Sequence, residues 1–117
     1  MPSPQLTLNL IQGSVTFTLP PEAAKDLQGA IAQLMQSLKE VAVQSQSGGG
    51  RPNKKESMEY RHTGEVFLEI FCNPNIYPSP FAAKVLITLR DERIRLTTEA
   101  ELTRLVEDLH QYLDQVG

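Results

Sequence analysis

The stretch EVFLEIFC, residues 65–72, decides how the rest of the chain can fold. Successive side chains of a β-strand point to opposite faces of a sheet, and here both faces carry large apolar residues. One face holds Val66, Leu68, Ile70 and Cys72. The other holds Phe67 and Phe71 with Glu69 between them. Small aliphatic side chains pack well against helices, so we expect the first set to face a helical layer and the phenylalanines to point away from it.

Upstream of this strand, the pattern predicts a β-hairpin over about residues 5–19 and then a helix over about 21–44. LTLNLI (6–11) and SVTFTL (14–19) both alternate, and Gly13 between them can take the positive φ that a tight turn demands. Pro20-Pro21 ends the second strand and opens the helix, because helix N-terminal N–H groups are unpaired in any case. The apolar residues at helical spacing are Leu27, Ile31, Leu34, Leu38 and Val41.

Around and after the central stretch, the sequence predicts a meander of three strands. MEYRHTGEVFLEIFC (58–72) is expected to be one long strand, bent or bulged near Gly64. KVLITLR (84–90) and RIRLT (93–97) supply the next two strands, joined by a tight turn. In the last strand we expect Ile94 and Leu96 to point inward and Arg93, Arg95 and Thr97 to point outward.

A capping box, Thr98-x-x-Glu101, predicts the start of a closing helix that runs to about residue 116. Arg104 and Asp108, four residues apart, are expected to pair on its surface. The expected inward side chains are Leu102, Leu105, Val106, Leu109, Leu113 and Val116.

Together these elements predict an α+β fold: an antiparallel sheet of about five strands, formed by a hairpin and then a three-strand meander, with two helices packed on one face. We expect a single domain over 1–117 with a flexible internal loop at 45–57. That loop contains three glycines and no large apolar residue, so it buries too little to offset the entropy of ordering. The strand order is not readable from the sequence.

Composition excludes several classes of protein. A hydrophobic content of 40% and a charged content of 21% are ordinary for a globular domain, and a net charge of −3 gives no long-range attraction to nucleic acid or anionic membranes. No apolar run approaches the roughly 18 residues of a membrane span, and the first ten residues do not resemble a signal peptide. The single Cys72 fits a reducing compartment, so we expect a cytoplasmic protein that makes no contact with membranes.

No residue pattern predicts catalysis, a metal or a cofactor. Cys72 would need a histidine to activate it, but it falls on the inward face, and His62 and His110 lie elsewhere in the pattern. Glu107, His110 and Asp114 share one helical face, yet no further His or Cys motif completes a metal shell. GGGRPNKK (48–55) follows a helix and precedes a strand, the reverse of a phosphate-binding loop. We therefore expect a protein that is not an enzyme.

The outward phenylalanines and the proline-rich loop NPNIYPSP (73–80) predict a protein-binding surface. Several large apolar side chains left in water together mark an interface, and prolines hold a loop in shape before it binds. The residues expected to bind are Phe67, Phe71, Ile76, Tyr77, Phe81, Leu86, Arg90 and Arg95, with Ile11 nearby. The function this suggests is a non-enzymatic adaptor or assembly factor whose partner is another protein, a peptide or a second copy of the chain.

Two alternatives stay open. Arginines beside outward phenylalanines are typical of sheets that bind single-stranded nucleic acid, although Glu65, Glu69, Asp91 and Glu92 interrupt the positive charge here. The 73–80 loop could also fold back over Phe67 and Phe71 and cover its own sheet. In general composition, the segments LPPEAAKDLQGAIAQLMQSL (19–38) and TTEAELTRLVEDLHQYL (97–113) resemble small cyanobacterial accessory proteins, among them assembly factors for carboxysomes and photosynthetic complexes. No residue-specific motif accompanies this resemblance, so no site is transferred from it.

Overall fold

The computed structural model describes the backbone of residues 4–46 and 55–116, and the side chains of all of these except 44–46. It has the predicted α+β architecture, with two antiparallel sheets, one of two strands and one of four. The flexible loop predicted at 45–57 lies mostly outside the described residues. The elements, in chain order, are β1 (Gln5–Asn9), β2 (Ser14–Thr18), α1 (Pro21–Gln46), β3 (Met58–His62), β4 (Phe67–Cys72), the 3-10 turns η1 (Pro74–Ile76) and η2 (Pro80–Ala82), β5 (Lys84–Arg90), β6 (Arg95–Glu101) and α2 (Leu102–Val116).

The first hairpin and the first helix form as predicted. β1 pairs with β2 from Gln5 opposite Thr18 to Asn9 opposite Ser14. Gly13 has a φ of 83°, the left-handed conformation that a glycine adopts without a steric penalty. The turn is closed by a 2.9 Å hydrogen bond from the Leu10 N–H to the Gly13 carbonyl.

The four-stranded sheet is a meander in the order β3-β4-β5-β6, and here one prediction is wrong. Residues 58–72 are two antiparallel strands, not one long bent strand, because the chain reverses between His62 and Phe67. Gly64 lies in this reversal, where an added Cβ would stand 2.8 Å from the imidazole Nε2 of His62. Both halves alternate in the same way, so the sequence pattern alone did not separate them.

The junction of β6 and α2 also differs from the prediction. Thr98 and Glu101 do not form a capping box, since both belong to β6, where they pair with Ile87 and Lys84. The helix begins at Leu102, whose N–H donates to the carbonyl of Ala83 at 3.0 Å. Ile94, expected to point inward, lies in the β5–β6 turn and is exposed.

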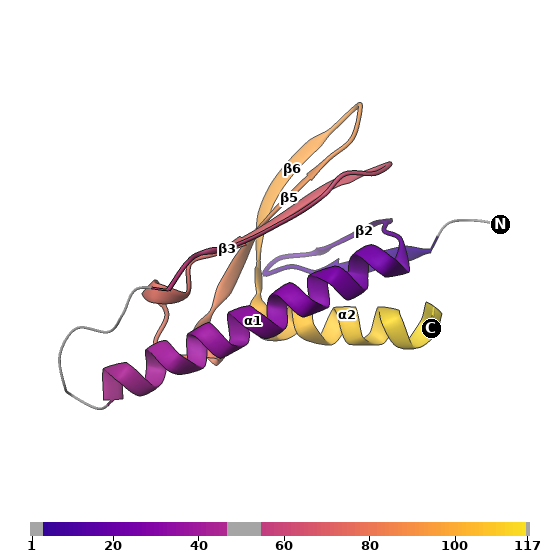
Figure 1. Ribbon diagram of the computed structural model, residues 1–117. Helices are drawn as coiled ribbons and strands as arrows, with labels where there is room; N and C mark the ends of the chain where they lie inside the picture. Colours follow the sequence, from indigo (N-terminus) through magenta and orange to yellow (C-terminus); the bar gives the residue numbers. More distant parts are fainter. Residues whose placement is uncertain (1–3, 47–54, 117) are drawn as a thin grey trace.

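Both helices lie together on one side of the four-stranded sheet, with the β1–β2 hairpin alongside them (Figure 1). The sheet residues that face this layer, Leu68, Ile70, Val85 and Ile87, are fully buried. Within α2 the predicted inward stripe needs correction. Val106 and Val116 are exposed, whereas Asp108 and Tyr112 are buried. The hydroxyls of Tyr60 and Tyr112 donate to backbone carbonyls of Ala23 and Leu19, which fixes the sheet and α2 to the start of α1. Among the described residues, neither helix is both long enough and apolar enough to cross a bilayer.

Candidate interaction surface

The face of the four-stranded sheet that points away from the helices, here called the outer face, is organised in four rows by the strand register, of which the fourth is the exposed pair Lys84 and Glu101. The first row is Phe67, Arg90 and Arg95. The middle row is Arg61, Glu69, Thr88 and Thr97. The third row is Glu59, Phe71, Leu86 and Glu99. Neighbouring rows are two residues apart along each strand, which is roughly 7 Å.

The apolar residues of the outer face lie on its two central strands, β4 and β5. Phe71 and Leu86 lie directly opposite each other on β4 and β5. Leu86 is 42% exposed, and both phenylalanines are half-buried. Thr88 is only 8% exposed although it also points outward, so its larger neighbours cover it. The two central strands therefore present the Phe71–Leu86 pair as one apolar contact, next to a threonine that is almost fully covered.

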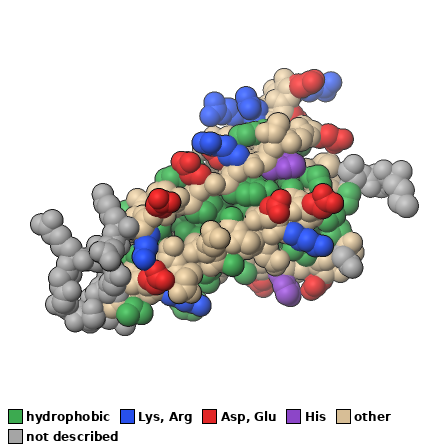
Figure 2. Space-filling model, viewed as in Figure 1, with side chains coloured by type: hydrophobic (Ala, Val, Ile, Leu, Met, Phe, Trp, Pro, Cys, Tyr) green, Lys and Arg blue, Asp and Glu red, His purple; other side chains and the backbone are tan. Residues whose placement is uncertain are grey.

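The charges of the outer face are at its ends. The Arg90 guanidinium lies over the Phe67 ring, 4.8 Å from its centroid, a cation–π contact. In the middle row, Arg61 Nε donates to Glu69 Oε2 at 2.6 Å, and this carboxylate raises the pKa of the Arg61 guanidinium. The first row therefore carries positive charge, the middle row is neutral, and the third row carries Glu59 and Glu99. Figure 2 shows basic side chains gathered along the upper edge of the molecule, where β5 and β6 rise.

The turn of the first hairpin extends the outer face beyond the edge of β6. The N–H of Ile11 donates to the Glu99 carbonyl at 3.3 Å. Ile11 and Leu86 lie on the two sides of a shallow depression of about 460 Å³ whose other lining residues include Thr97 and Glu99. Ile11, which the sequence analysis placed near this surface, is 48% exposed.

The proline-rich loop is in a different place from the outer face. η1 packs against α1, and η2 packs against both helices, so the loop lies on the helical side of the molecule. Pro74 and Pro80 are buried there and Tyr77 packs against the core, whereas Ile76 is 66% and Phe81 83% exposed. The structure thus separates the predicted binding residues into two groups: Phe67, Phe71, Leu86, Arg90 and Arg95 on the outer face, and Ile76, Tyr77 and Phe81 on the loop. The loop covers the core of its own molecule, but it does not cover Phe67 or Phe71.

Hydrogen bonds from asparagine side chains hold the loop in this position. The Asn73 side-chain oxygen accepts from the Asn75 N–H at 3.0 Å. The Asn75 side chain bonds both the N–H and the carbonyl of Lys55, at 2.9 and 2.7 Å. Lys55 is also 2.5 Å from the Glu40 carboxylate of α1, which lowers the pKa of Glu40. The loop is therefore anchored to both α1 and the start of the β3 segment.

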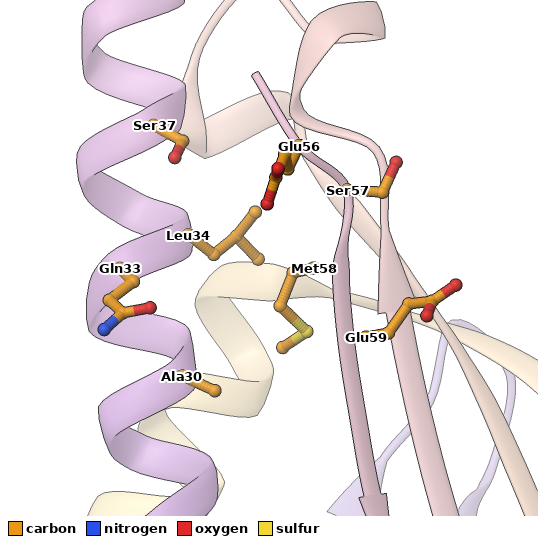
Figure 3. Close-up of a pocket in the computed structure, with 8 residues that line it drawn as sticks. All are labelled: Ala30, Gln33, Leu34, Ser37, Glu56, Ser57, Met58 and Glu59. Atoms are coloured by element: carbon orange, nitrogen blue, oxygen red, sulfur yellow. The ribbon is translucent and has the colours of Figure 1, made fainter.

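A second hollow, of about 430 Å³, lies between α1 and the segment that leads into β3 (Figure 3). Leu34 of α1 and Met58 of β3 point toward one another at its floor. Its remaining lining is mostly polar and includes the carboxylates of Glu56 and Glu59. The hollow is bordered by β3, which within residues 4–46 and 55–116 pairs with β4 and with no second strand.

The side chains considered for catalysis or metal binding lie apart. Cys72 is buried, and this burial raises the pKa of its thiol to about 11, so little thiolate forms near neutral pH. His62 is opposite Leu68, whereas Cys72 is opposite Met58, four residues or about 13 Å along the hairpin. His110 lies 3.6 Å from the Asp114 carboxylate on the surface of α2. Nowhere in residues 4–46 and 55–116 do three potential metal ligands come together.

Asp108 is a structural residue that the sequence analysis misassigned. It was expected on the helix surface with Arg104, and Arg104 Nε does approach it to 3.6 Å. However, Asp108 is buried and accepts hydrogen bonds from the backbone N–H and the side-chain amide of Asn9, at 2.8 and 2.9 Å. It therefore attaches β1 to α2. Its position three residues after Leu105 and four before Tyr112, on the buried stripe, was the signal that could have identified it.

Comparison of the chain with protein-family models, with curated proteins and with solved structures gave no match.

Proposed function

We propose that this protein is a non-enzymatic protein-binding adaptor or assembly factor and that its binding surface is the outer face of the four-stranded sheet. The observation that carries the proposal is the Phe71–Leu86 pair, which leaves apolar surface exposed on the two central strands, with Glu59 and Glu99 beside it on the edge strands and Arg90 and Arg95 in the first row. Interfaces commonly have this composition, with an apolar or aromatic centre, arginine close by and a polar rim. The buried, protonated Cys72 supports a role without nucleophilic catalysis, and a lone cysteine suits a cytoplasmic location.

The contacts of the outer face favour a protein partner over single-stranded nucleic acid. Nucleic-acid bases stack on exposed aromatic faces, but Arg90 already lies over the Phe67 ring. Glu69 neutralises Arg61, and Glu59 and Glu99 add negative charge on the same face. A phosphate backbone would be repelled from one end of this surface.

Affinity capture from the native lysate tests the proposal, with the full chain as bait and successive washes at low and high salt. We expect proteins to be retained through the high-salt wash, because burial of apolar surface depends little on salt. Phe71→Ser should release them by weakening the interaction by about 1–3 kcal/mol. Phe81→Ser is the matched control, since it removes an equally large exposed ring from the helical side of the molecule.

Each other outcome of the capture has a defined meaning. Equal retention by the wild type and Phe71→Ser would contradict a binding role for the outer face. If Phe81→Ser also abolished retention of the captured proteins, the loop would be part of the interface. Material that is released by salt and sensitive to nuclease would support the nucleic-acid alternative, because counterion release makes phosphate binding strongly salt-dependent.

A further inference from the structure

The charges of the outer face are arranged so that one end complements the other. Along β6 the outward residues are Arg95, Thr97, Glu99 and Glu101, each two residues from the next, and the last of them lies opposite Lys84, a residue of opposite charge. Arg90 strengthens the positive end and Glu59 the negative end. Arg90, Arg95, Glu59 and Glu99 are all exposed. A surface whose positive and negative ends lie equally far from a neutral middle row matches a second copy of itself turned end over end.

We propose that the outer face binds a second copy of this chain across a two-fold axis that runs across the strands, over the middle row. This inference rests on the proposed function, that the outer face is a protein interface. In such a pair the two sheets stack face to face about 10 Å apart, and the axis places the first row of each copy on the third row of the other.

The contacts that this axis creates are complementary on β6 and β4. On β6, Arg95 of each copy faces Glu99 of the other. On β4, Phe67 of each copy faces Phe71 of the other, which gives two aromatic pairs, one on each side of Glu69. On β5, Arg90 of each copy lies over Leu86 of the other, which its aliphatic stem can cover. The depression beside Glu99, bordered by Ile11 and Leu86, is a hollow in which the guanidinium of Arg95 from the second copy can reach a carboxylate.

The middle row faces its own copy in this arrangement, and its side chains tolerate that position. Thr88 and Thr97 face the same threonines, which are small and uncharged, so the axis brings no like charges together at these two positions. Glu69 would repel another Glu69, but its 2.6 Å contact with Arg61 makes the pair neutral. No uncompensated like charge is therefore placed on the axis.

The other possible two-fold axis in the plane of the interface is disfavoured by the same charges. An axis along the strands, between β4 and β5, would place β3 on β6 and keep each row on itself. Glu59 of one copy would then face Glu99 of the other, and this contact would occur twice in the pair. Like charges opposed across an interface are destabilising, so the charge pattern selects the first axis.

The size of the face sets the strength of the association. Four strands spaced about 4.8 Å apart, with a rise of about 3.3 Å per residue, cover on the order of 400 Å² per copy. That is about half of the area that each partner contributes to an interface of standard size. We therefore expect a reversible dimer with a Kd in the range of roughly 10–100 µM, present in concentrated solution and dissociated in dilute solution.

Charge reversal on the full chain tests the inference, with sedimentation equilibrium over a concentration range of about 1 to 500 µM, which brackets that Kd. Arg95→Glu and Glu99→Arg should each raise the Kd of the dimer by about tenfold, because each places two pairs of like charges across the interface. The double variant, Arg95→Glu with Glu99→Arg, should restore dimerisation, since the opposed charges are again of opposite sign. Lys39→Glu, the same change of charge on an exposed residue of α1, is the control and should leave the Kd unchanged.

A dimer whose Kd responds equally to the three single substitutions, or that the double variant fails to restore, would overturn the proposed axis. A chain that remains monomeric at the highest concentration would overturn the self-association itself. If that monomer still captures other proteins and Phe71→Ser still releases them, the inference fails while the proposed function stands. If the capture is also insensitive to Phe71→Ser, both fail. Circular dichroism of each variant confirms that the chain is folded before the Kd values are compared.

Discussion

The outer face of the sheet and the proline-rich loop both expose large apolar side chains, but they do so for different structural reasons. On the loop, Ile76 and Phe81 are more exposed than any apolar residue of the outer face. The residues beside them, Pro74, Pro80 and Tyr77, are instead packed into the molecule. On the outer face, Phe67, Phe71 and Leu86 are only partly exposed, but Phe71 and Leu86 are paired in register, and charged residues lie in the rows around them.

The difference shows that the exposure of one residue is a poor guide to an interface. Exposed apolar residues that stand singly are normal on protein surfaces, and a loop that must cover the end of a core leaves some of them behind. A flat sheet face instead offers neighbouring side chains that one partner can cover together. The two regions should therefore differ in how much their apolar side chains contribute to the free energy of unfolding.

Between the loop and the outer face, the larger expected effect on stability is at the anchor of the loop. Tyr77→Ala should lower the free energy of unfolding by about 2 kcal/mol, because Tyr77 is half-buried against the core and its truncation leaves a gap beneath the loop. Phe81→Ala, four residues further on, should change the free energy of unfolding by less than about 0.5 kcal/mol. Urea unfolding of both variants measures the difference. Equal effects would mean that the loop is not held by its tyrosine.

The sequence did not show which residues of the loop pack against the core and which are exposed. The prolines correctly indicated a loop of fixed shape, but prolines stiffen a chain in the same way whether they face a partner or their own core. The side of the sheet on which the loop lies depends on contacts with α1 and α2, which are distant in sequence. The sequence pattern therefore placed Tyr77 on the same binding surface as Phe71, whereas in the structure Tyr77 lies on the helical side of the molecule.

The elements that the sequence predicted well are those specified by local chemistry. Gly13 supplied the turn of the first hairpin, and the alternation in residues 66–72 correctly placed Leu68, Ile70 and Cys72 inward. The errors came where one local pattern fits two structures. The strand residues on both sides of Gly64 read as one strand or as a hairpin. The spacing of Thr98 and Glu101 fits a capping box, and only their pairing with β5 shows that they belong to a strand.

A smaller effect is expected on the outer face itself. Phe71→Ser should lower the free energy of unfolding by only about 1 kcal/mol, because substitutions on the open face of a strand lose cross-strand contacts without leaving a closed cavity. Ile70→Ala, one residue earlier and fully buried, should lower it by about 3 kcal/mol. Thermal and urea unfolding of dilute protein provide the measurement. If Phe71→Ser unfolds the chain, the outer face is part of the core and the proposed interface is wrong.

The smallest expected effect is at the turn that holds the positive end of the outer face. Arg90 and Arg95 close the β5–β6 hairpin opposite each other, and the turn between them is fixed by Asp91. One oxygen of its carboxylate accepts from the N–H groups of Arg93 and Ile94, at 2.8 and 2.9 Å. These two backbone donors lower the pKa of Asp91 below its usual value of 3.8. The corresponding bonds in the loop, between Asn73 and Asn75, involve neutral amides only.

Only the turn should therefore respond to acid. Because the pKa of Asp91 is lowered in the folded chain, its bonds stabilise the turn fully above pH 3.8, and that stabilisation is lost as the pH falls below 3.8 through the folded pKa. In NMR spectra recorded from pH 6 down to about 2.5, the amide resonances of Arg93 and Ile94 should shift together with a midpoint below 3.8. The Asn75 amide should not share that midpoint, and Asp91→Asn should abolish the shift at Arg93 and Ile94. A midpoint at or above 3.8 would mean that the Asp91 carboxylate does not hold the turn. The turn would then not be what fixes the positions of Arg90 and Arg95 on the outer face.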